Sequence, residues 1–241
     1  MKLAIVGKGM MGRLLVQLAE GMKKDGEDIQ WIEVIEPATG ESLFDIPQPD
    51  VIIDFSHPDA LDDIYRYVSS KEGTVSVVFG TTGFTSEQLM QIKKLSEIAP
   101  VIQSYNYSYG IQTLKKLIGC AVPMLKERSD IEIIEKHHRY KADAPSGTAL
   151  MLAECCDPDH NKQWRCGREG QHKRGDEIGI HSLRGGTIFG EHHVIFALQD
   201  EVVTVSHTAF SKNIFAKGAL EAALWLNGKK KGMYSIEDVF Y

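Results

Sequence analysis

The most constraining feature of this chain is a glycine-rich loop that directly follows an apolar strand. Residues 3–6 are Leu-Ala-Ile-Val, a run without polar alternation that is typical of a parallel strand buried on both faces. Glycines follow at positions 7, 9 and 12, and apolar residues then recur at helical spacing from Leu14. In a G-x-G-x-x-G loop the first glycine permits a tight turn, the second lets a pyrophosphate approach the backbone, and the third lets the helix pack closely. The sequence therefore predicts a dinucleotide-binding unit.

The choice of dinucleotide depends on the residues around the second expected strand, residues 30–35. This strand ends at Glu36, close to the spacing at which an acidic residue binds the adenosine ribose hydroxyls. The alternative interpretation of Glu36 is a polar residue entering a turn before Pro37. No Arg or Lys follows Glu36 directly to pair with a 2′-phosphate, although Lys8 in the loop could reach one. We therefore expect NADH or NADPH as the cofactor, with NADH favoured.

Strands and helices alternate through the first part of the chain, which predicts a Rossmann-type parallel sheet. The third, fourth and fifth strands are expected at residues 51–55, 75–79 and 101–103. The fourth runs into Gly-Thr-Thr-Gly at residues 80–83. A small, hydroxyl-bearing turn at the carboxyl end of a strand is where doubly wound sheets bind ligands.

The pattern changes in the second half of the chain. Helices are expected over residues 111–126, 146–156 and 213–226, and strands over 131–138, 178–183, 191–198 and 201–207. Residues 157–177 are polar and are expected to form a loop, residues 199–200 a tight hairpin turn, and residues 234–241 a short tail. This order predicts a strand-rich α+β unit with a mixed or antiparallel sheet.

The densest chemistry of the sequence lies in residues 131–152. An apolar-rich strand there is followed by His137, His138 and Lys141, and a helix then opens at residues 146–148, Ser-Gly-Thr. Imidazole and ammonium groups can exchange protons near neutral pH, and a helix start offers unpaired N–H groups and a positive dipole. The alternative is a solvated basic turn before an ordinary capped helix. The short spacing favours a site for proton transfer to an anionic molecule.

The composition limits the class of protein. A chain of 241 residues with 43% hydrophobic and 25% charged residues is typical of a globular protein of one large or two modest domains. Its net charge of −6 argues against a nucleic-acid partner. No run approaches the roughly 18 apolar residues of a membrane span, and no leader precedes the first strand, so we expect no membrane partner and a cytoplasmic location. The four cysteines match no zinc pattern, and we expect reduced thiols and no metal.

Residues 135–149, from Glu-Lys-His-His to Pro-Ser-Gly-Thr-Ala, closely resemble dihydrodipicolinate reductases, also called 4-hydroxy-tetrahydrodipicolinate reductases. The part from residue 137 to 148 is highly specific to that family, whereas the glycine loop is not. The resemblance covers nearly the whole chain. Further matching segments are residues 54–56, 80–83, 106–108 with Gly110, 182–186, 190–192 and 222–226.

The resemblance implies a reaction and a domain organisation. Family members use NADH or NADPH to reduce a cyclic, imine-like dicarboxylate in lysine and diaminopimelate biosynthesis. The implied dinucleotide-binding domain comprises residues 1–105 and 213–241. Residues 106–212 would form the substrate-binding domain, which builds a homotetramer through its sheet.

The resemblance also implies roles for individual residues. By position, His137 is similar to the family's proton donor or acceptor and Lys141 to its second proton donor. If His137 protonates the substrate, like charge from His138 and Lys141 should lower its pKa. The implied substrate-binding residues are His138, Lys141, Ser146, Gly147 and Thr148. The implied cofactor-binding residues are Gly7, Lys8, Gly9, Met10, Met11, Gly12, Glu36, Gly80, Thr81, Thr82, Ser104, Tyr105, Asn106 and Tyr107.

Two other functions fit a dinucleotide-binding chain. A regulator that senses NAD(H) would usually carry a DNA-binding module, and no helix-turn-helix is evident. A dehydrogenase acting on an amino-acid semialdehyde would need a reactive cysteine, and Cys120 lies in an apolar helical segment. A role for Arg184 in substrate binding or assembly is open. The remaining histidines are interpreted as polar strand or loop residues, namely His57, His172, His181, His192, His193 and His207.

Overall fold

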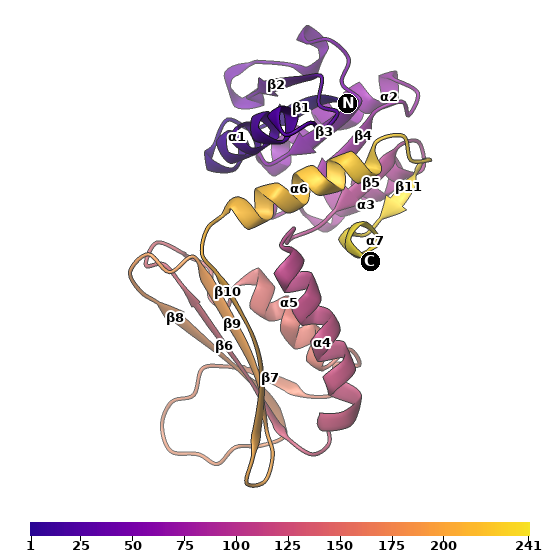
Figure 1. Cartoon of the computed structure of the whole chain (residues 1–241). Helices are drawn as coiled ribbons and strands as arrows, with labels where there is room; N and C mark the ends of the chain where they lie inside the picture. The colour runs from indigo at the N-terminus through magenta and orange to yellow at the C-terminus, as the bar shows by residue number, and fades with distance from the viewer. The chain divides into compact units, whose positions relative to one another are not determined.

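The computed structural model describes all 241 residues, which form two compact units (Figure 1). The first unit comprises Met1–Ser108 and Asn213–Tyr241, and the second comprises Tyr109–Lys212. The first unit thus extends three residues beyond the boundary expected at residue 105. The reason is Tyr107, whose side chain is 1% exposed and belongs to the hydrophobic core of the first unit.

The first unit is built on a six-stranded sheet in which every pairing is parallel, as expected for a Rossmann-type unit. In spatial order its strands are β11 (Gly232–Tyr234), β5 (Pro100–Gln103), β4 (Ser76–Phe79), β3 (Val51–Asp54), β1 (Lys2–Val6) and β2 (Trp31–Ile35). The strand β2 pairs with one edge of β1, and the next strand along the chain, β3, pairs with the other edge. The strand order therefore reverses between β1 and β3. The crevice at the carboxyl ends of these two strands is therefore the place where a doubly wound sheet binds its ligand.

Helices cover both faces of this sheet. The helices α1 (Met10–Lys24) and α6 (Asn213–Leu226) pack on one face, and α2 (Leu61–Ser70) and α3 (Ser86–Ser96) pack on the other. Successive strand residues point to opposite faces, so both faces must be apolar. This explains why the strands have continuous apolar runs. Three short 3-10 helices, Pro37–Thr39, Leu43–Asp45 and Pro58–Ala60, lie in the connections.

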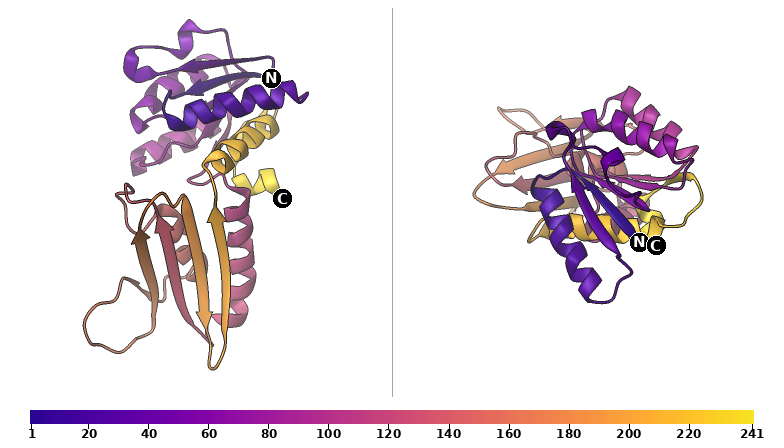
Figure 2. Two further views of the ribbon diagram at one scale, coloured as in Figure 1. Left: turned by 60° about the vertical axis from the view of Figure 1, so that its left-hand side comes forward. Right: turned by 90° about the horizontal axis from the view of Figure 1, so that it is seen from above.

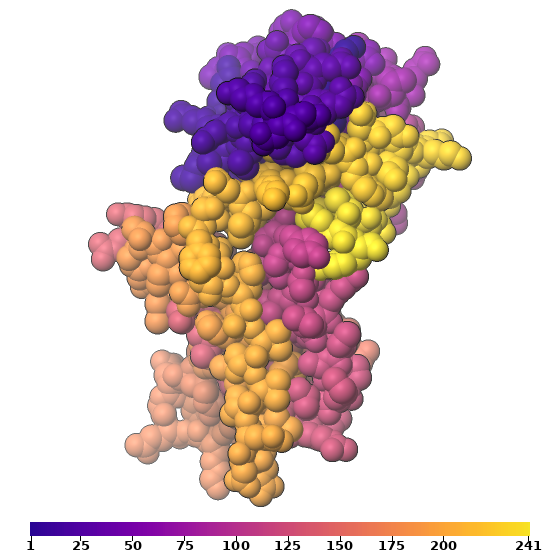
Figure 3. All heavy atoms as spheres, in the orientation of Figure 1, coloured from indigo at the N-terminus to yellow at the C-terminus, as the bar shows by residue number.

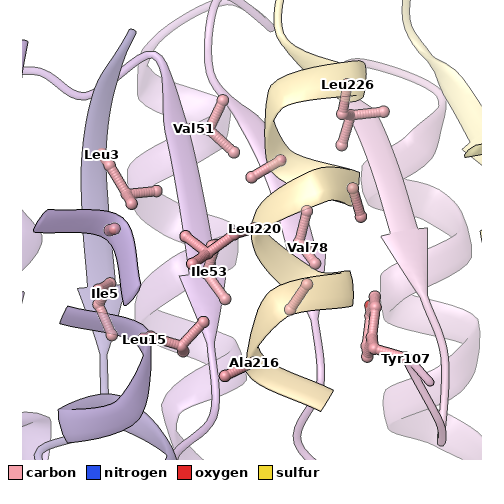
Figure 4. Close-up of a cluster of buried hydrophobic side chains, with 14 of the residues drawn as sticks. Leu3, Ile5, Leu15, Val51, Ile53, Val78, Tyr107, Ala216, Leu220 and Leu226 are labelled. Atoms are coloured by element: carbon pink, nitrogen blue, oxygen red, sulfur yellow. The ribbon is translucent and has the colours of Figure 1, made fainter. Parts of the chain in front are cut away.

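The helix α6 completes the core of the first unit from far along the sequence. Its residue Leu220 lies beside Ile53 of the sheet, and Ala216 lies beside Leu15 of α1 (Figure 4). In the space-filling view, the yellow atoms of the C-terminal segment lie directly against the indigo atoms of the N-terminal segment (Figure 3). A β-carbon on Gly218 would overlap the carbonyl oxygen of Tyr107. Small residues thus let α6 approach the sheet and the segment after β5 closely.

The second unit has a five-stranded mixed sheet, as expected, with two helices on one face (Figure 2). In spatial order its strands are β10 (Val202–Ala209), β9 (Gly190–Ala197), β6 (Asp130–His137), β8 (Glu177–Arg184) and β7 (Gln163–Cys166). The central strand β6 pairs antiparallel with β9 and parallel with β8. The helices α4 (Tyr109–Leu125) and α5 (Gly147–Cys156) pack on the face that carries Ile131 and Ile133.

Three short elements depart from the expectations. The strand β7 lies inside the expected loop of residues 157–177, β11 ends at the first residue of the expected tail, and the helix α7 (Ile236–Phe240) lies inside that tail. Both strands are at sheet edges and have at most four residues, which is too short for an apolar periodicity to be visible. The expected hairpin turn is confirmed, because Leu198 N–H donates to Glu201 O across residues 199–200. None of the helices is long and apolar enough to cross a membrane.

Candidate active site

The glycine loop joins β1 to α1 at the carboxyl edge of the first sheet. Gly7 has a φ of +108°, and a β-carbon there would overlap the carbonyl oxygen of Phe55. A β-carbon on Gly12 would overlap the carbonyl oxygen of Gly7. Around Gly9, in contrast, nothing lies within 4 Å of the β-carbon position, and no side chain caps the helix that begins there. Gly7 and Gly12 are therefore required by the packing of the fold. Gly9 leaves open space beside helix N–H groups, which suits a phosphate.

Two carboxylates lie beside this loop. Oε2 of Glu36 accepts a hydrogen bond from the backbone N–H of Lys8 at 2.9 Å. Glu41, which the sequence did not single out, accepts from the backbone N–H of Glu36 at 2.8 Å and pairs with the ammonium of Lys8. Its hydrogen bond with Lys8 lowers the pKa of the Glu41 carboxyl. The only lysine of the loop is thus held by a carboxylate.

The turns after β3 and β4 are joined through a buried carboxyl group. Oδ1 of Asp54 accepts from the backbone N–H of Ser56 at 3.1 Å, and the same N–H lies 2.9 Å from Oγ1 of Thr81. Burial raises the pKa of Asp54 to about 6, although hydrogen bonds from Ser56 and Thr81 oppose the rise. Gly80 and Thr81 are buried and belong to this network, whereas Thr82 is exposed.

The segment after β5 presents one aromatic ring outward and buries another. Tyr105 is 55% exposed. Tyr107 is buried, and its hydroxyl donates to the carbonyl oxygen of Phe79 at 2.7 Å. Ser104 and Asn106 bond to each other through the Ser104 hydroxyl. The side chain of Tyr107 therefore supports the fold, and Tyr105 is the exposed aromatic residue of this segment.

In the second unit, the stretch from His137 to Thr148 forms the expected strand end and helix start. The strand β6 ends at His137, and α5 begins at Gly147 with Ser146 as its N-cap. Oγ of Ser146 accepts from the backbone N–H of Ala149 at 3.2 Å. No atom lies within 4 Å of a β-carbon position on Gly147, which is exposed. The Ser146 hydroxyl thus caps the helix, and the open part of the helix start lies at Gly147.

Glu135 is a fully buried carboxylate beneath this site. Its oxygens accept four hydrogen bonds, from His137 Nδ1 at 2.6 Å, Ser146 N at 3.1 Å, and Arg184 Nη1 and Nη2 at 2.8 and 2.7 Å. Burial by itself would raise the pKa of Glu135. Hydrogen bonds from Arg184 and His137 outweigh burial and lower this pKa to about 2, so the group is ionised at neutral pH.

His137 lies beside a second imidazole, that of His192. The ring centroids are 5.2 Å apart and the planes meet at 74°. Burial is the largest cause that lowers the pKa of His137; Glu135 opposes the change, and Lys141 adds to it. The pKa of His137 is thus lowered, as expected. The main cause is burial and not like charge, however, and His138 is not among the causes. Burial, with further help from His137, lowers the pKa of His192 to about 3.

The other two predicted side chains of this site lie on the turn after β6. Nζ of Lys141 is 2.8 Å from Oδ1 of Asp143, and the backbone N–H of Lys141 donates to the carbonyl oxygen of His138. Nδ1 of His138 is buried without a hydrogen-bond partner, and its ring lies 6.3 Å from that of Tyr140. This turn therefore offers one ammonium group and one unpaired imidazole nitrogen.

Three residues of this cluster had no assigned role in the sequence analysis: Glu135 was not singled out, the role of Arg184 was open, and His192 was interpreted as a polar strand or loop residue. The register of the sheet brings them together, because His137 pairs with Arg184 on β8 and Glu135 pairs with His192 on β9. Arg184 also donates to the carbonyl oxygen of Asp143 at 2.6 Å. The one local signal was the two-residue spacing of Glu135 and His137, which places both on the same face of a strand.

Other candidate features lie apart from this cluster. A surface hollow of about 590 Å³ at the opposite end of β6 is lined mainly by polar and charged residues, and no predicted site residue is among them. Cys120, expected within an apolar segment, is exposed, because it lies on the outer side of α4. No group of three or more His, Cys, Asp or Glu side chains could hold a metal ion.

Comparison with known proteins identifies relatives of both halves of the chain. The family profile described as "Dihydrodipicolinate reductase, N-terminus" matches residues 1–107, and that described as "Dihydrodipicolinate reductase, C-terminus" matches residues 110–240. A 4-hydroxy-tetrahydrodipicolinate reductase of Exiguobacterium sp. is 40% identical over 100% of this chain and 96% of its own. The Clostridium novyi reductase is 47% identical over 79% of this chain and 76% of its own.

Solved structures agree on the fold. A dipicolinate-bound dihydrodipicolinate reductase from Paenisporosarcina sp. TG-14 matches with a TM-score of 0.73 at 24% identity, covering 97% of each chain. A myo-inositol dehydrogenase from Corynebacterium glutamicum matches with a TM-score of 0.58 at 14% identity, covering 100% of this chain and 92% of its own. At these identities the likeness concerns the fold.

Proposed function

This chain belongs to the dihydrodipicolinate reductase family, and we propose that it reduces 4-hydroxy-tetrahydrodipicolinate to tetrahydrodipicolinate in lysine and diaminopimelate biosynthesis. This conversion takes up a hydride and a proton and releases the 4-hydroxyl group as water. It needs a hydride source, a proton donor and groups that hold two carboxylates. The observation that carries the proposal is the cluster at the end of β6, where the charge of Lys141 helps to lower the pKa of His137 beside the open start of α5.

We assign the nicotinamide cofactor, which supplies the hydride when bound, to the first unit. The glycine loop fits this role, because the space over Gly9 and the uncapped first turn of α1 suit a pyrophosphate. Glu36 would bind the ribose hydroxyls. The other proposed contacts follow β4 and β5 at the same edge of the sheet and are Gly80, Thr81, Thr82, Ser104, Tyr105, Asn106 and Tyr107.

We further propose that the cofactor used is NADH. A 2′-phosphate on the adenosine ribose would approach Glu36 and Glu41 together, and Lys8, whose backbone N–H binds Glu36, has its ammonium paired with Glu41. The variant Glu41→Gln releases Lys8 and removes one negative charge. We expect it to raise kcat/KM for NADPH relative to NADH by about 3-fold or more, the scale of an exposed charge interaction. Glu33→Gln, on an exposed position of β2, is the control, and an unchanged ratio in both variants would exclude Glu41 from cofactor selection.

The second unit would hold the substrate. Backbone N–H groups at Gly147 and Thr148 can bind one carboxylate at the helix start that Ser146 caps. His138 and Lys141 can bind the other carboxylate. His137 and Lys141 are the two candidates for delivering the proton as the hydride arrives.

The proposal includes assembly as a homotetramer through the sheet of the second unit and a cytoplasmic location. The edge strand β10 supports the assembly, because no strand pairs with its outer side and its residues Val202 and Val203 are 61% and 40% exposed. An unpaired edge with apolar side chains favours pairing with another copy of the chain. Four free thiols suit a reducing compartment.

A coupled assay tests the proposed reaction. Dihydrodipicolinate synthase converts pyruvate and aspartate semialdehyde to the substrate, and the purified protein is then followed by the loss of NADH or NADPH absorbance. We expect oxidation only when all components are present. Oxidation with the semialdehyde alone would favour a semialdehyde dehydrogenase, and no oxidation with either cofactor would favour a dinucleotide sensor.

A further inference from the structure

Every acceptor position of the Glu135 carboxylate is used. A carboxylate offers about four acceptor positions, and Glu135 receives four hydrogen bonds, two on each oxygen. Two of these come from the guanidinium of Arg184 in a bidentate pair, which fixes the plane of the carboxylate. A fully buried and fully bonded carboxylate can hold its partners in one geometry.

These bonds connect Glu135 to three parts of the proposed substrate site. The first is the ring of His137, and the second is the backbone N–H of Ser146, which caps α5. The third is the turn between β6 and α5, because Arg184 links Glu135 to the carbonyl oxygen of Asp143. The proton donor, the anion-binding helix start and the turn that carries Lys141 thus share one anchor.

We propose that Glu135 is the positioning residue of this site, holding the proton on Nδ1 of His137 so that Nε2 exchanges the proton with the substrate. This inference rests on the proposed function for its substrate, but the state of the His137 ring belongs to the free protein. In a turnover, the Nε2–H of the imidazolium would pass its proton to the substrate. The ring would then be neutral and still carry the Nδ1 proton bonded to Glu135.

The assignment of the two ring nitrogens follows from charge. An ionised carboxylate has no proton to donate, so Nδ1 of His137 must be the donor in the 2.6 Å contact. Nε2 faces Gly190, where an added β-carbon would lie 3.2 Å away. The titratable and charged groups around the ring are Glu135 on β6, Arg184 on β8, His192 on β9 and Lys141 on the turn. Glu135 is the only anion among them.

The wild-type protein gives the first test. Nitrogen-15 NMR of histidine-labelled protein without substrate distinguishes a protonated ring nitrogen from an unprotonated one, and His137→Gln identifies the signals of His137. We expect Nδ1 to be protonated and Nε2 unprotonated at a pH where the ring is neutral. The opposite tautomer would overturn the proposal whether or not the protein reduces the proposed substrate.

The strand β6 supplies a matched control for the second test. Glu132 lies on the opposite face of this strand and also binds a histidine and an arginine, His181 at 2.7 Å and Arg174 at 3.1 Å. Glu135→Gln should lower kcat by roughly 10- to 100-fold, the scale found when a hydrogen-bonded carboxylate that orients a metal-binding histidine is lost. Glu132→Gln should leave kcat unchanged.

The pH profile separates positioning from a purely structural role. In Glu135→Gln the ring of His137 loses its only neighbouring anion, so its pKa falls and the alkaline decline of kcat moves to lower pH. Its NMR signals should also show a mixture of tautomers. A Glu135→Gln protein that keeps the wild-type tautomer and pH profile would overturn the proposal even if it were less stable. If this variant does not fold, Glu135→Asp, which keeps the charge, serves as the second variant. It should have a reduced kcat and a pH profile close to that of wild type. A kcat equal to that of wild type would overturn the proposal.

Discussion

At the scale of single residues, the site contains a histidine that the fold keeps neutral. His192 is 4% exposed, and Nε2 lies 3.2 Å from the hydroxyl of Ser146. Burial lowers its pKa to about 3, against an ordinary value near 6.5. Between these two values the unfolded chain binds a proton that the folded chain excludes. The free energy of unfolding therefore decreases as the pH falls through this window.

This linkage predicts a difference between variants. From pH 6.5 to 5, His192 should lower the free energy of unfolding by about 2 kcal/mol, since each pH unit in this window corresponds to about 1.4 kcal/mol. In His192→Gln this contribution is absent. The free energy of unfolding, measured with urea, should therefore differ less between the two pH values than in wild type. His57→Gln, whose side chain is 75% exposed, is the control and should keep the wild-type difference. The same pH dependence in all three proteins would show that His192 is not held neutral.

The sequence predicted only part of this site, and the reason is physical. His137, Lys141 and the helix start at Ser146 are close in sequence, so local chemistry and spacing indicated them. Arg184 is 49 residues from its partner Glu135, and only the parallel pairing of β6 with β8 brings them together. The burial that lowers the pKa of His192 likewise arises only when β9 pairs with β6 in the sheet.

At the scale of elements, the glycine loop predicts two different effects of one substitution. Gly12→Ala should lower the free energy of unfolding by about 2 kcal/mol or more, because the new β-carbon would overlap the carbonyl oxygen of Gly7. Gly9→Ala, which meets no atom within 4 Å, should cost less than about 1 kcal/mol but weaken cofactor binding by filling the space for the pyrophosphate. Denaturant unfolding of both variants measures the change in stability, and titration with NADH measures the change in cofactor binding. Equal stability of the two variants would contradict the packing described here.

The elements that the sequence predicted are those with a strong periodic signal. The strands β1 and β3 are continuous apolar runs, and α6 shows apolar residues at helical spacing over its whole length. In contrast, β7 has the sequence Gln-Trp-Arg-Cys and β11 has three residues, so neither shows a pattern. Their strand conformation depends on the neighbouring strands β8 and β5, to which they add at the sheet edges.

At the scale of the whole molecule, the chain closes its first unit with its last residues. The C-terminal family profile covers residues 110–240, yet α6 and α7 belong to the first unit, so the sequence families and the compact units divide the chain differently. The sequence alone could not show that α6 belongs to the first unit, because the apolar pattern of a helix does not indicate which sheet it packs against. The resemblance to the reductase family supplied the expectation of a discontinuous domain.

The proposed tetramer predicts the mass of the assembly. Sedimentation equilibrium or light scattering should give a species of four times the chain mass of 26.9 kDa. Val203→Lys places a charge on the edge strand β10, where Val203 is 40% exposed, and should shift the protein toward smaller species. A wild-type mass of one chain would contradict assembly through this sheet.

The measurement that tests the central claim most directly is the steady-state kinetics of His137→Gln in the coupled assay. If His137 takes part in proton transfer, kcat should fall by roughly 100-fold or more, because general acid catalysis contributes this much. KM for the substrate should change far less, whereas Lys141→Ala should impair both kcat and KM. A His137→Gln protein that turns over at the wild-type rate would contradict the account.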